Sequence, residues 1–150
     1  MRVVDLVDRS VVTAPLDATV LEAAMKMKEH NVGCVVVVDG ERVAGILTDR
    51  DIVMKLAAGD FHDPEQRVAP LMSRRPICAR SGDDLDSGLA RMREHHVRRL
   101  PVLNDEGELI GVVTLDDVLL QMSRSLNQAA DLVREEVAGI PRESWHSTLR

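Results

Sequence analysis

The feature that most constrains the fold of this chain is that its sequence repeats itself. Residues 28–32 (Lys-Glu-His-Asn-Val) align with residues 93–97 (Arg-Glu-His-His-Val), and at the same offset Met27 aligns with Met92. Self-similarity at a fixed offset is typical of chains built from copies of one supersecondary unit. We therefore expect two related copies in tandem.

The match continues after one inserted residue near Asp105. Residues 45–48 (Gly-Ile-Leu-Thr) align with residues 111–114 (Gly-Val-Val-Thr), and Asp51 aligns with Asp117. The predicted division is a tandem pair over 1–125, with repeats at about 4–58 and 68–123 joined by a polar linker at 59–67, followed by a C-terminal helix and tail over 126–150.

Each copy has the element order β-α-β-β-α. Runs of apolar residues and turn-forming pairs such as Asp39-Gly40 predict the strands, and Thr19 with Glu22 predicts a capping box at a helix start. The expected strands are 11–13, 34–38, 43–47, 76–78, 100–103 and 109–113, and the expected helices are 19–30, 84–95 and those after Thr48 and Thr114.

One such unit would bury too little surface to be stable by itself, so we expect the two copies to pack sheet to sheet around one core. Aromatic residues are 1% of the chain, so aliphatic side chains and Met must fill that core. The predicted fold class is α/β, in the mixed α+β form.

The last helix is predicted to continue without Gly or Pro from Leu115 to Ala138 and to end at Gly139 and Pro141. Trp145 is expected at the surface or in a subunit contact. Packing of the helix on its own core and packing on a second chain both remain open. Its apolar stripe comprises Leu115, Leu119, Met122, Leu126, Ala130, Val133 and Val137.

Three segments resemble the cystathionine-β-synthase (CBS) domain pair, also called a Bateman module. They are Gly45-Ile-Leu-Thr-Asp-Arg-Asp51, its counterpart Gly111-Val-Val-Thr-Leu-Asp-Asp117, and the middle strand Val97-Arg-Arg-Leu-Pro-Val102. The resemblance implies an intertwined pair with pseudo-twofold symmetry that usually forms a flat homodimer. It also implies clefts between the repeats that bind AMP, ADP, ATP, S-adenosylmethionine or NAD.

The motif has a physical rationale of its own. A strand that ends at Leu47 and passes into a helix leaves free backbone N–H groups, which attract anions such as phosphate. The Thr48 hydroxyl can donate to a phosphate, the Asp51 carboxylate can accept from two ribose hydroxyls, and Gly45 permits close approach of backbone or ligand. Thr48 and Asp51 also fit a plain capping box that needs no ligand.

The resemblance assigns roles to residues in both repeats. Ribose binding falls to Asp51 and Asp117. Phosphate binding falls to Thr48, Arg50, Arg98, Arg99 and Thr114, with Arg98 and Arg99 serving the ligand that Asp51 holds. Base binding falls to the backbone of Val12, Thr13, Ala14, Ile77, Cys78 and Ala79.

The two clefts are not equivalent. In the second cleft Gly33 and Cys34 replace Arg98 and Arg99, and Asp116 replaces Arg50. We therefore expect the Asp51 cleft to prefer the more phosphorylated ligand, with the Asp117 cleft empty or holding an uncharged adenosyl group.

Other function classes have less support. The net charge of −6 and the scarce aromatics disfavour nucleic-acid binding. The sequence contains no nucleophile elbow, no Gly-rich phosphate loop with its Lys and no HExxH motif, so it does not predict an enzyme. A zinc site that combines histidines with Cys34 or Cys78 is chemically conceivable, but no CxxC or HxxxH spacing supports it, so no metal is expected.

No apolar run is long enough for a membrane span, so we expect a cytoplasmic protein. The predicted function is a non-catalytic sensor of an adenine nucleotide that signals to an unidentified effector protein. The alternative is a ligand-free structural or stress-response interaction module.

Overall fold

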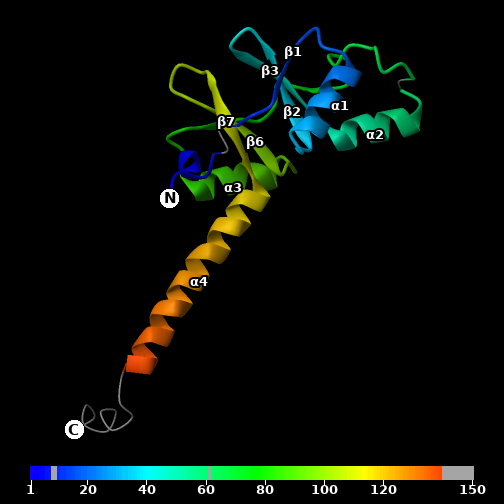
Figure 1. Ribbon diagram of the computed structural model, residues 1–150. Helices are drawn as coiled ribbons and strands as arrows, with labels where there is room; N and C mark the ends of the chain where they lie inside the picture. Colours follow the sequence, from blue (N-terminus) through cyan, green and yellow to red (C-terminus); the bar gives the residue numbers. More distant parts are fainter. Residues whose placement is uncertain (8–9, 61, 140–150) are drawn as a thin grey trace, which may run out of the picture. The chain divides into compact units, whose positions relative to one another are not determined.

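The computed structural model describes residues 1–7, 10–60 and 62–139 of the chain (Figure 1). The predicted roles of Pro141 and Trp145 lie outside the described residues. Contacts divide the chain into two units, residues 1–115 and residues 116–150. The described residues form a mixed α+β fold with two sheets and four α-helices, as predicted.

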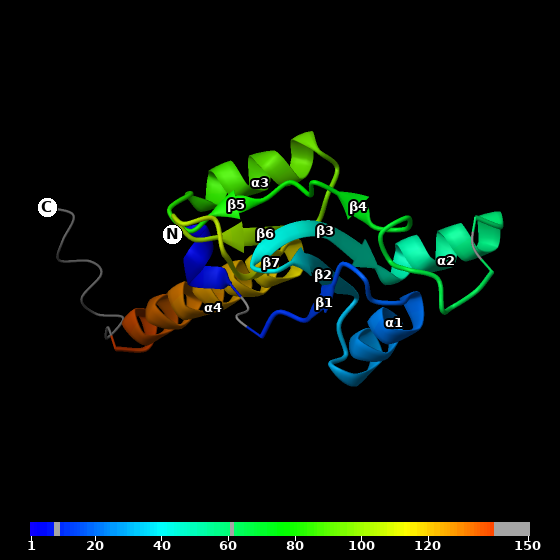
Figure 2. The same cartoon turned by 90° about the horizontal axis from the view of Figure 1, so that it is seen from above.

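The first repeat forms a sheet with the order β1-β2-β3-β4, in which β1 is parallel to β2 and the other pairs are antiparallel. Helix α1 contacts β2, and α2 contacts β3 (Figures 1 and 2). The elements are β1 (Thr13–Pro15), α1 (Val20–Glu29), β2 (Cys34–Asp39), β3 (Arg42–Thr48), α2 (Asp49–Ala58) and, from the segment after the linker, β4 (Ser73–Arg74).

The second repeat has the same topology, with a sheet of order β5-β6-β7 and a parallel pair followed by an antiparallel pair. The inner strands and the helices lie within one or two residues of their predicted positions. The elements are β5 (Ala79–Arg80), α3 (Leu85–Glu94), β6 (Arg99–Leu103), β7 (Leu109–Thr114) and α4 (Leu115–Gly139).

The first strand of each repeat was misplaced by sequence reasoning. Residues 11–13 and 76–78 were predicted, whereas the strands are Thr13–Pro15 and Ala79–Arg80. These short strands exist only through parallel pairing with the middle strand, and that pairing sets their limits by tertiary contact. Cys78 therefore precedes its strand.

The predicted capping box of α1 is confirmed. The Thr19 hydroxyl accepts the backbone N–H of Glu22 at 3.1 Å, and the Glu22 carboxylate accepts the N–H of Thr19 at 2.8 Å. In the second repeat, the Asp84 carboxylate caps α3 by accepting the Ser87 N–H at 2.7 Å. These bonds satisfy N–H groups that the helix itself cannot.

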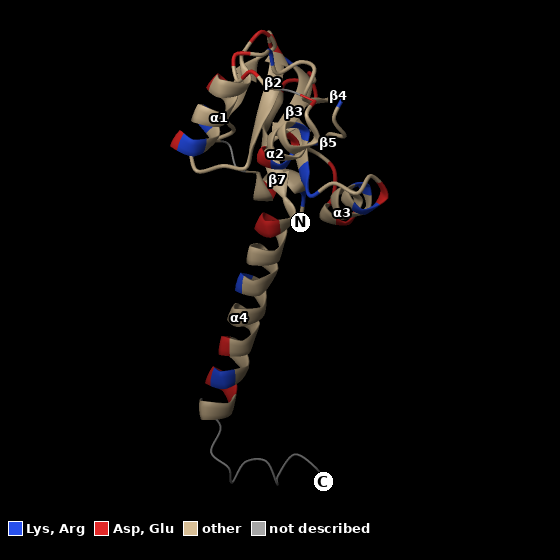
Figure 3. Cartoon of the chain, turned by 90° about the vertical axis from the view of Figure 1, so that its right-hand side faces the viewer, with Lys and Arg blue, Asp and Glu red and all other residues tan. Residues whose placement is uncertain are grey.

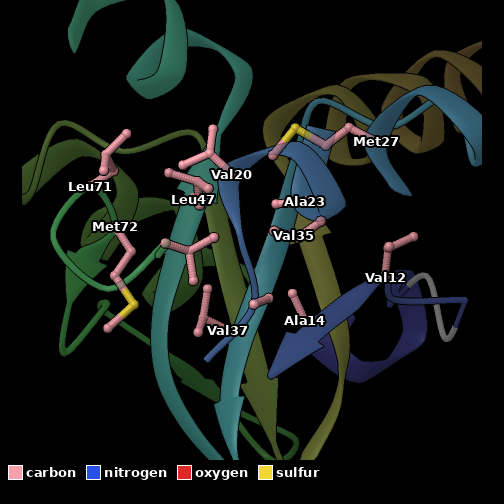
Figure 4. Packing of buried hydrophobic residues seen from close by; sticks show 12 residues of the cluster. Val12, Ala14, Val20, Ala23, Met27, Val35, Val37, Leu47, Leu71 and Met72 are labelled. Atoms are coloured by element: carbon pink, nitrogen blue, oxygen red, sulfur yellow. The ribbon is translucent and has the colours of Figure 1, made fainter. Parts of the chain in front are cut away.

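The core of the first repeat is aliphatic and includes residues from beyond the repeat (Figure 4). Val35 and Val37 of β2 and Leu47 of β3 are fully buried under α1. The cluster is completed from the segment after the linker by Val68, Leu71 and Met72.

The segments at the starts of the two repeats are exchanged. Val68 donates its N–H to the carbonyl of Ala18 in the first repeat, at 2.9 Å. Val3, its counterpart in η1 (Val3–Leu6), donates its N–H to the carbonyl of Asp83 in the second repeat, also at 2.9 Å. Val3 and Val68 are both 0% exposed. Each repeat is therefore completed by the segment that leads into the other, so the pair is intertwined.

Gly45 lies where this exchange brings two backbones together. A Cβ atom on Gly45 would collide with the Met72 side chain and would lie 2.9 Å from the Ser73 carbonyl oxygen in β4. The close approach expected at Gly45 is therefore made by the β4 backbone, which pairs with β3 at this residue.

We expect Gly45→Ala to lower the free energy of unfolding by about 1–3 kcal/mol, because the added methyl overpacks the contact with β4. Gly82 is the control, since a Cβ there meets nothing within 4 Å. Gly82→Ala should change stability by less than about 0.5 kcal/mol in the same urea titration. Equal effects of the two substitutions would contradict the packing at Gly45.

In the second unit, α4 carries acidic and basic residues interspersed along its length (Figure 3). Members of the predicted apolar stripe are exposed, among them Leu126 at 70% and Val137 at 61%. Packing of the stripe on the chain's own core and packing on a second chain both remain open. No helix among the described residues has the length and apolar character that crossing a membrane requires.

Candidate functional site

The junction between β3 and α2 is the best-defined part of the predicted site. The Asp51 carboxylate accepts the Thr48 backbone N–H at 2.9 Å and the Thr48 hydroxyl at 2.7 Å, and the Asp51 N–H donates to the Thr48 hydroxyl at 3.1 Å. The capping box that sequence reasoning kept as an alternative is thus formed.

The capping box and ligand binding are chemically compatible at Asp51. Both bonds from Thr48 end on the same carboxylate oxygen, Oδ2. The second oxygen, Oδ1, can accept a hydroxyl from a ligand, and the side chain is half-buried rather than enclosed. The box holds the carboxylate in one orientation, which reduces the entropy that a ligand must remove.

In each repeat, the residue before the middle strand accepts a backbone hydrogen bond from the first residue of the last helix. The Asp49 N–H donates to the Gly33 carbonyl at 3.2 Å, and the Leu115 N–H donates to the Arg98 carbonyl at 2.9 Å. The repeats therefore place the start of their middle strand beside the start of their last helix.

An arginine of the second repeat reaches the junction of the first. A Cβ atom on Gly33 would lie 3.0 Å from Nη2 of Arg99 and 3.2 Å from Oδ2 of Asp49. The Arg99 guanidinium and the Asp49 carboxylate thus converge on one point at the start of α2, and a side chain at position 33 would intrude between them. The Arg99 side chain therefore lies near the start of α2, and its phosphate-binding role remains a prediction.

Cys34 lies in the same group of residues and is half-buried. Burial raises the pKa of the Cys34 thiol, the Arg99 guanidinium opposes that rise, and the Asp49 carboxylate adds to it. The pKa of Cys78 is also raised by burial, against the influence of Arg91. Both thiols are therefore protonated at neutral pH and poor nucleophiles.

The remaining residues that were predicted to bind the phosphate or, for Asp117, the ribose lie at the two junctions. Arg50 is exposed, and its N–H donates to the Asp49 carboxylate at 2.7 Å. Arg98 is exposed, with its backbone beside Leu115. Thr114 ends β7, and Asp117 lies in the first turn of α4. Their ligand roles remain predictions.

The predicted base-binding residues lie in or beside the first strand of each repeat. Ala14 and Ala79 belong to β1 and β5, and both residues are buried, with exposures of 1% and 0%. The other members are Val12, Thr13, Ile77 and Cys78, of which Thr13 is in β1. Their base-binding role remains a prediction.

A cavity of about 710 Å³ lies at a different place, against the β2–β3 and β6–β7 turns. Of the predicted site residues it contains Cys78 alone, and its charged side chains, such as Glu41, Arg75 and Glu106, are exposed. Mixed exposed charges give no defined ligand chemistry, so we base the candidate site on the junction geometry instead.

The described part of the chain holds no group of three or more His, Cys, Asp or Glu side chains arranged to bind a metal ion. Sequence reasoning assigned no role to Asp49, whose carboxylate lies beside Gly33 together with the Arg99 guanidinium. The sequence does contain a signal for Asp49, because the aligned residue of the second repeat is the uncharged Leu115, so the two junctions differ in charge at this position.

The protein-family model for the CBS domain matches residues 3–58 and 68–124. Uncharacterized protein MK0525 of Methanopyrus kandleri is 35% identical over 112 residues, which cover 74% of this chain and 57% of that protein. CBS domain-containing protein YhcV of Bacillus subtilis is 36% identical over 120 residues, covering 79% of this chain and 84% of YhcV. The chain thus spans just over half of the first relative and most of the second.

Three crystal structures resemble the fold. The CBS domain pair of protein MJ0100, in complex with 5′-methylthioadenosine and S-adenosyl-L-methionine, has a TM-score of 0.75 and 25% identity, covering 83% of this chain and 98% of that chain. CBS domain protein PAE2072 from Pyrobaculum aerophilum, complexed with AMP, has a TM-score of 0.73 and 27% identity, covering 83% and 99%. Hypoxic Response Protein I with two coordinated zinc ions has a TM-score of 0.70 and 34% identity, covering 79% and 97%.

Proposed function

This chain belongs to the CBS-domain family, and from that membership we propose that it is a non-catalytic regulatory module that binds an adenosyl ligand between its repeats. The binding module comprises residues 1–125. One similar structure holds AMP, and another holds 5′-methylthioadenosine and S-adenosyl-L-methionine, which supports an adenosine-containing ligand for this chain. Binding acts on an effector protein by favouring one arrangement of the repeats over another.

The observation that carries the proposal is the junction at Asp51. A half-buried carboxylate is fixed by Thr48 at a helix start, and Arg99 from the other repeat reaches the same helix start. A carboxylate pairs with the two hydroxyls of a ribose, while helix N–H groups and a guanidinium attract phosphate. We assign the ribose to Asp51 and the phosphate to Arg50, Arg99 and the Thr48 hydroxyl, which must turn its proton from Oδ2 of Asp51 to the phosphate when the ligand binds.

The alternative is a structural or stress-response interaction module with both clefts empty. It is favoured by the capping role of Thr48 and Asp51, which already stabilises α2 without a ligand. The two functions differ in one measurable respect, which is whether an adenosyl compound stabilises the folded protein.

We expect AMP, ATP, 5′-methylthioadenosine or S-adenosylmethionine, supplied at 100 times its Kd, to stabilise the folded state by about 2.7 kcal/mol. This corresponds to a rise in Tm of about 5–10 °C for a chain of this length. Guanosine and cytidine nucleotides serve as controls. If no adenosyl compound raises the Tm or gives heat in calorimetry, the interaction module is the better account.

We also propose a homodimer, in keeping with the flat dimers of the family. The contacting helices α1 and α2 both expose apolar side chains, which a second copy would cover. These side chains are Leu21, Met25, Val53, Met54 and Leu56. Light scattering should give twice the chain mass, and Met25→Glu should shift the protein toward monomer because it buries a charge in that contact. Lys28→Glu, an exposed change on the same helix, should leave the mass unchanged.

A further inference from the structure

Asp49 places a negative charge at the point where the proposed site needs to attract phosphate. Its Oδ2 atom and Nη2 of Arg99 lie 3.2 Å and 3.0 Å from the position that a Cβ on Gly33 would occupy. Both groups also influence the thiol of Cys34, in opposite directions. The exposed Asp49 carboxylate and the half-buried Arg99 guanidinium therefore lie beside the same backbone position at the boundary between the repeats.

Backbone hydrogen bonds hold Asp49 in place. The Asp49 N–H is bonded to the Gly33 carbonyl, and its Oδ1 atom accepts the Arg50 N–H. Arg99, in contrast, reaches across from the second repeat on a long side chain. A phosphate that arrives at the start of α2 meets a fixed carboxylate and an adjustable guanidinium.

This charge has no counterpart in the other repeat. The residue aligned with Asp49 is Leu115, and the residue aligned with Arg99 is Cys34. The carboxylate–guanidinium pair is thus a property of the Asp51 junction alone.

We propose that Asp49 is a specificity-determining residue of the Asp51 site, because it competes with the ligand's phosphate for Arg99. This inference rests on the proposed function and deepens it. Without ligand, the Asp49 carboxylate balances the Arg99 charge. A bound phosphate takes Arg99 as its partner and is repelled by Asp49, so each added phosphate charge gains less affinity than the arginines alone would give.

The test is calorimetry with two ligands that share adenosine but differ in charge, AMP and the uncharged 5′-methylthioadenosine. We expect Asp49→Asn to tighten AMP binding about three- to tenfold, since it removes a like charge near the phosphate. The affinity for 5′-methylthioadenosine should change by less than about twofold. Asparagine keeps an oxygen that can accept the Arg50 N–H, so the helix start is preserved.

Two further variants make the result specific. Asp105→Asn removes the same charge from an exposed turn, and it should leave AMP binding unchanged. Combining Asp49→Asn with Arg99→Met should abolish most of the gain, because the carboxylate then has no guanidinium to release.

The possible outcomes distinguish the proposed role of Asp49 from the proposed adenosyl-binding function on which it rests. If the wild type binds AMP, and Asp49→Asn behaves like Asp105→Asn, the role of Asp49 is wrong while the proposed function stands. The same holds if Asp49→Asn tightens both ligands equally. If the wild type binds neither ligand, the proposed function is wrong and the inference fails with it.

Discussion

Leu71→Ala should lower the free energy of unfolding by about 2–5 kcal/mol, the largest stability effect that we expect in this chain. Leu71 is 3% exposed and belongs to the core cluster of the first repeat, although it lies at the start of the second repeat in sequence. Its removal leaves a cavity beneath the exchanged segment. Urea unfolding followed by circular dichroism measures the loss.

Ser73→Ala provides the control for Leu71→Ala. Ser73 lies two residues further along the same segment and is exposed, so its substitution should cost less than about 0.5 kcal/mol. If the two repeats were independent folding units, Leu71→Ala would produce a small effect like that of Ser73→Ala. If Leu71→Ala lowered the free energy of unfolding by less than about 0.5 kcal/mol, as expected for an exposed residue, the exchange of segments would be contradicted.

Asp51→Ala should weaken binding of the adenosyl ligand by about ten- to a hundredfold, through loss of charge-assisted bonds to the ribose. The variant also loses the bonds from the Thr48 N–H and hydroxyl, which should cost about 1 kcal/mol of stability. Calorimetry at a temperature where the variant is folded separates the two effects.

The chain supplies a matched control for Asp51→Ala. Glu22 occupies the same position in the capping box of α1, where its carboxylate accepts the Thr19 N–H at 2.8 Å. Glu22→Ala should reduce stability by a similar amount and leave ligand affinity unchanged. Equal affinity in both variants would assign Asp51 to helix capping alone.

Much of this fold follows from local sequence. The Thr19–Glu22 box, the apolar run of β2 and the Asp39-Gly40 turn each depend on neighbours along the chain, and each lies where it was predicted. Because the sequence repeats, each element of the β-α-β-β-α order was predicted independently from two segments of the chain. Local chemistry suffices where the competing conformations are also local.

The exchanged segments could not be predicted in the same way. Val3 and Val68 carry no helical or alternating pattern, and their burial depends on contacts with the opposite repeat. The short strands β1, β4 and β5 likewise depend on their partners. Asp49 was missed because the role that we propose for it depends on Arg99, which is distant in sequence but lies near the same backbone position, Gly33, in the fold.

The most direct measurement is a crystal structure of the wild-type protein with AMP. Our account expects the ribose hydroxyls within hydrogen-bond distance of the Asp51 carboxylate, and the phosphate at the start of α2 beside Arg99. Binding of AMP elsewhere, for instance in the cavity between the strand turns, or an empty Asp51 junction at saturating AMP, would contradict it.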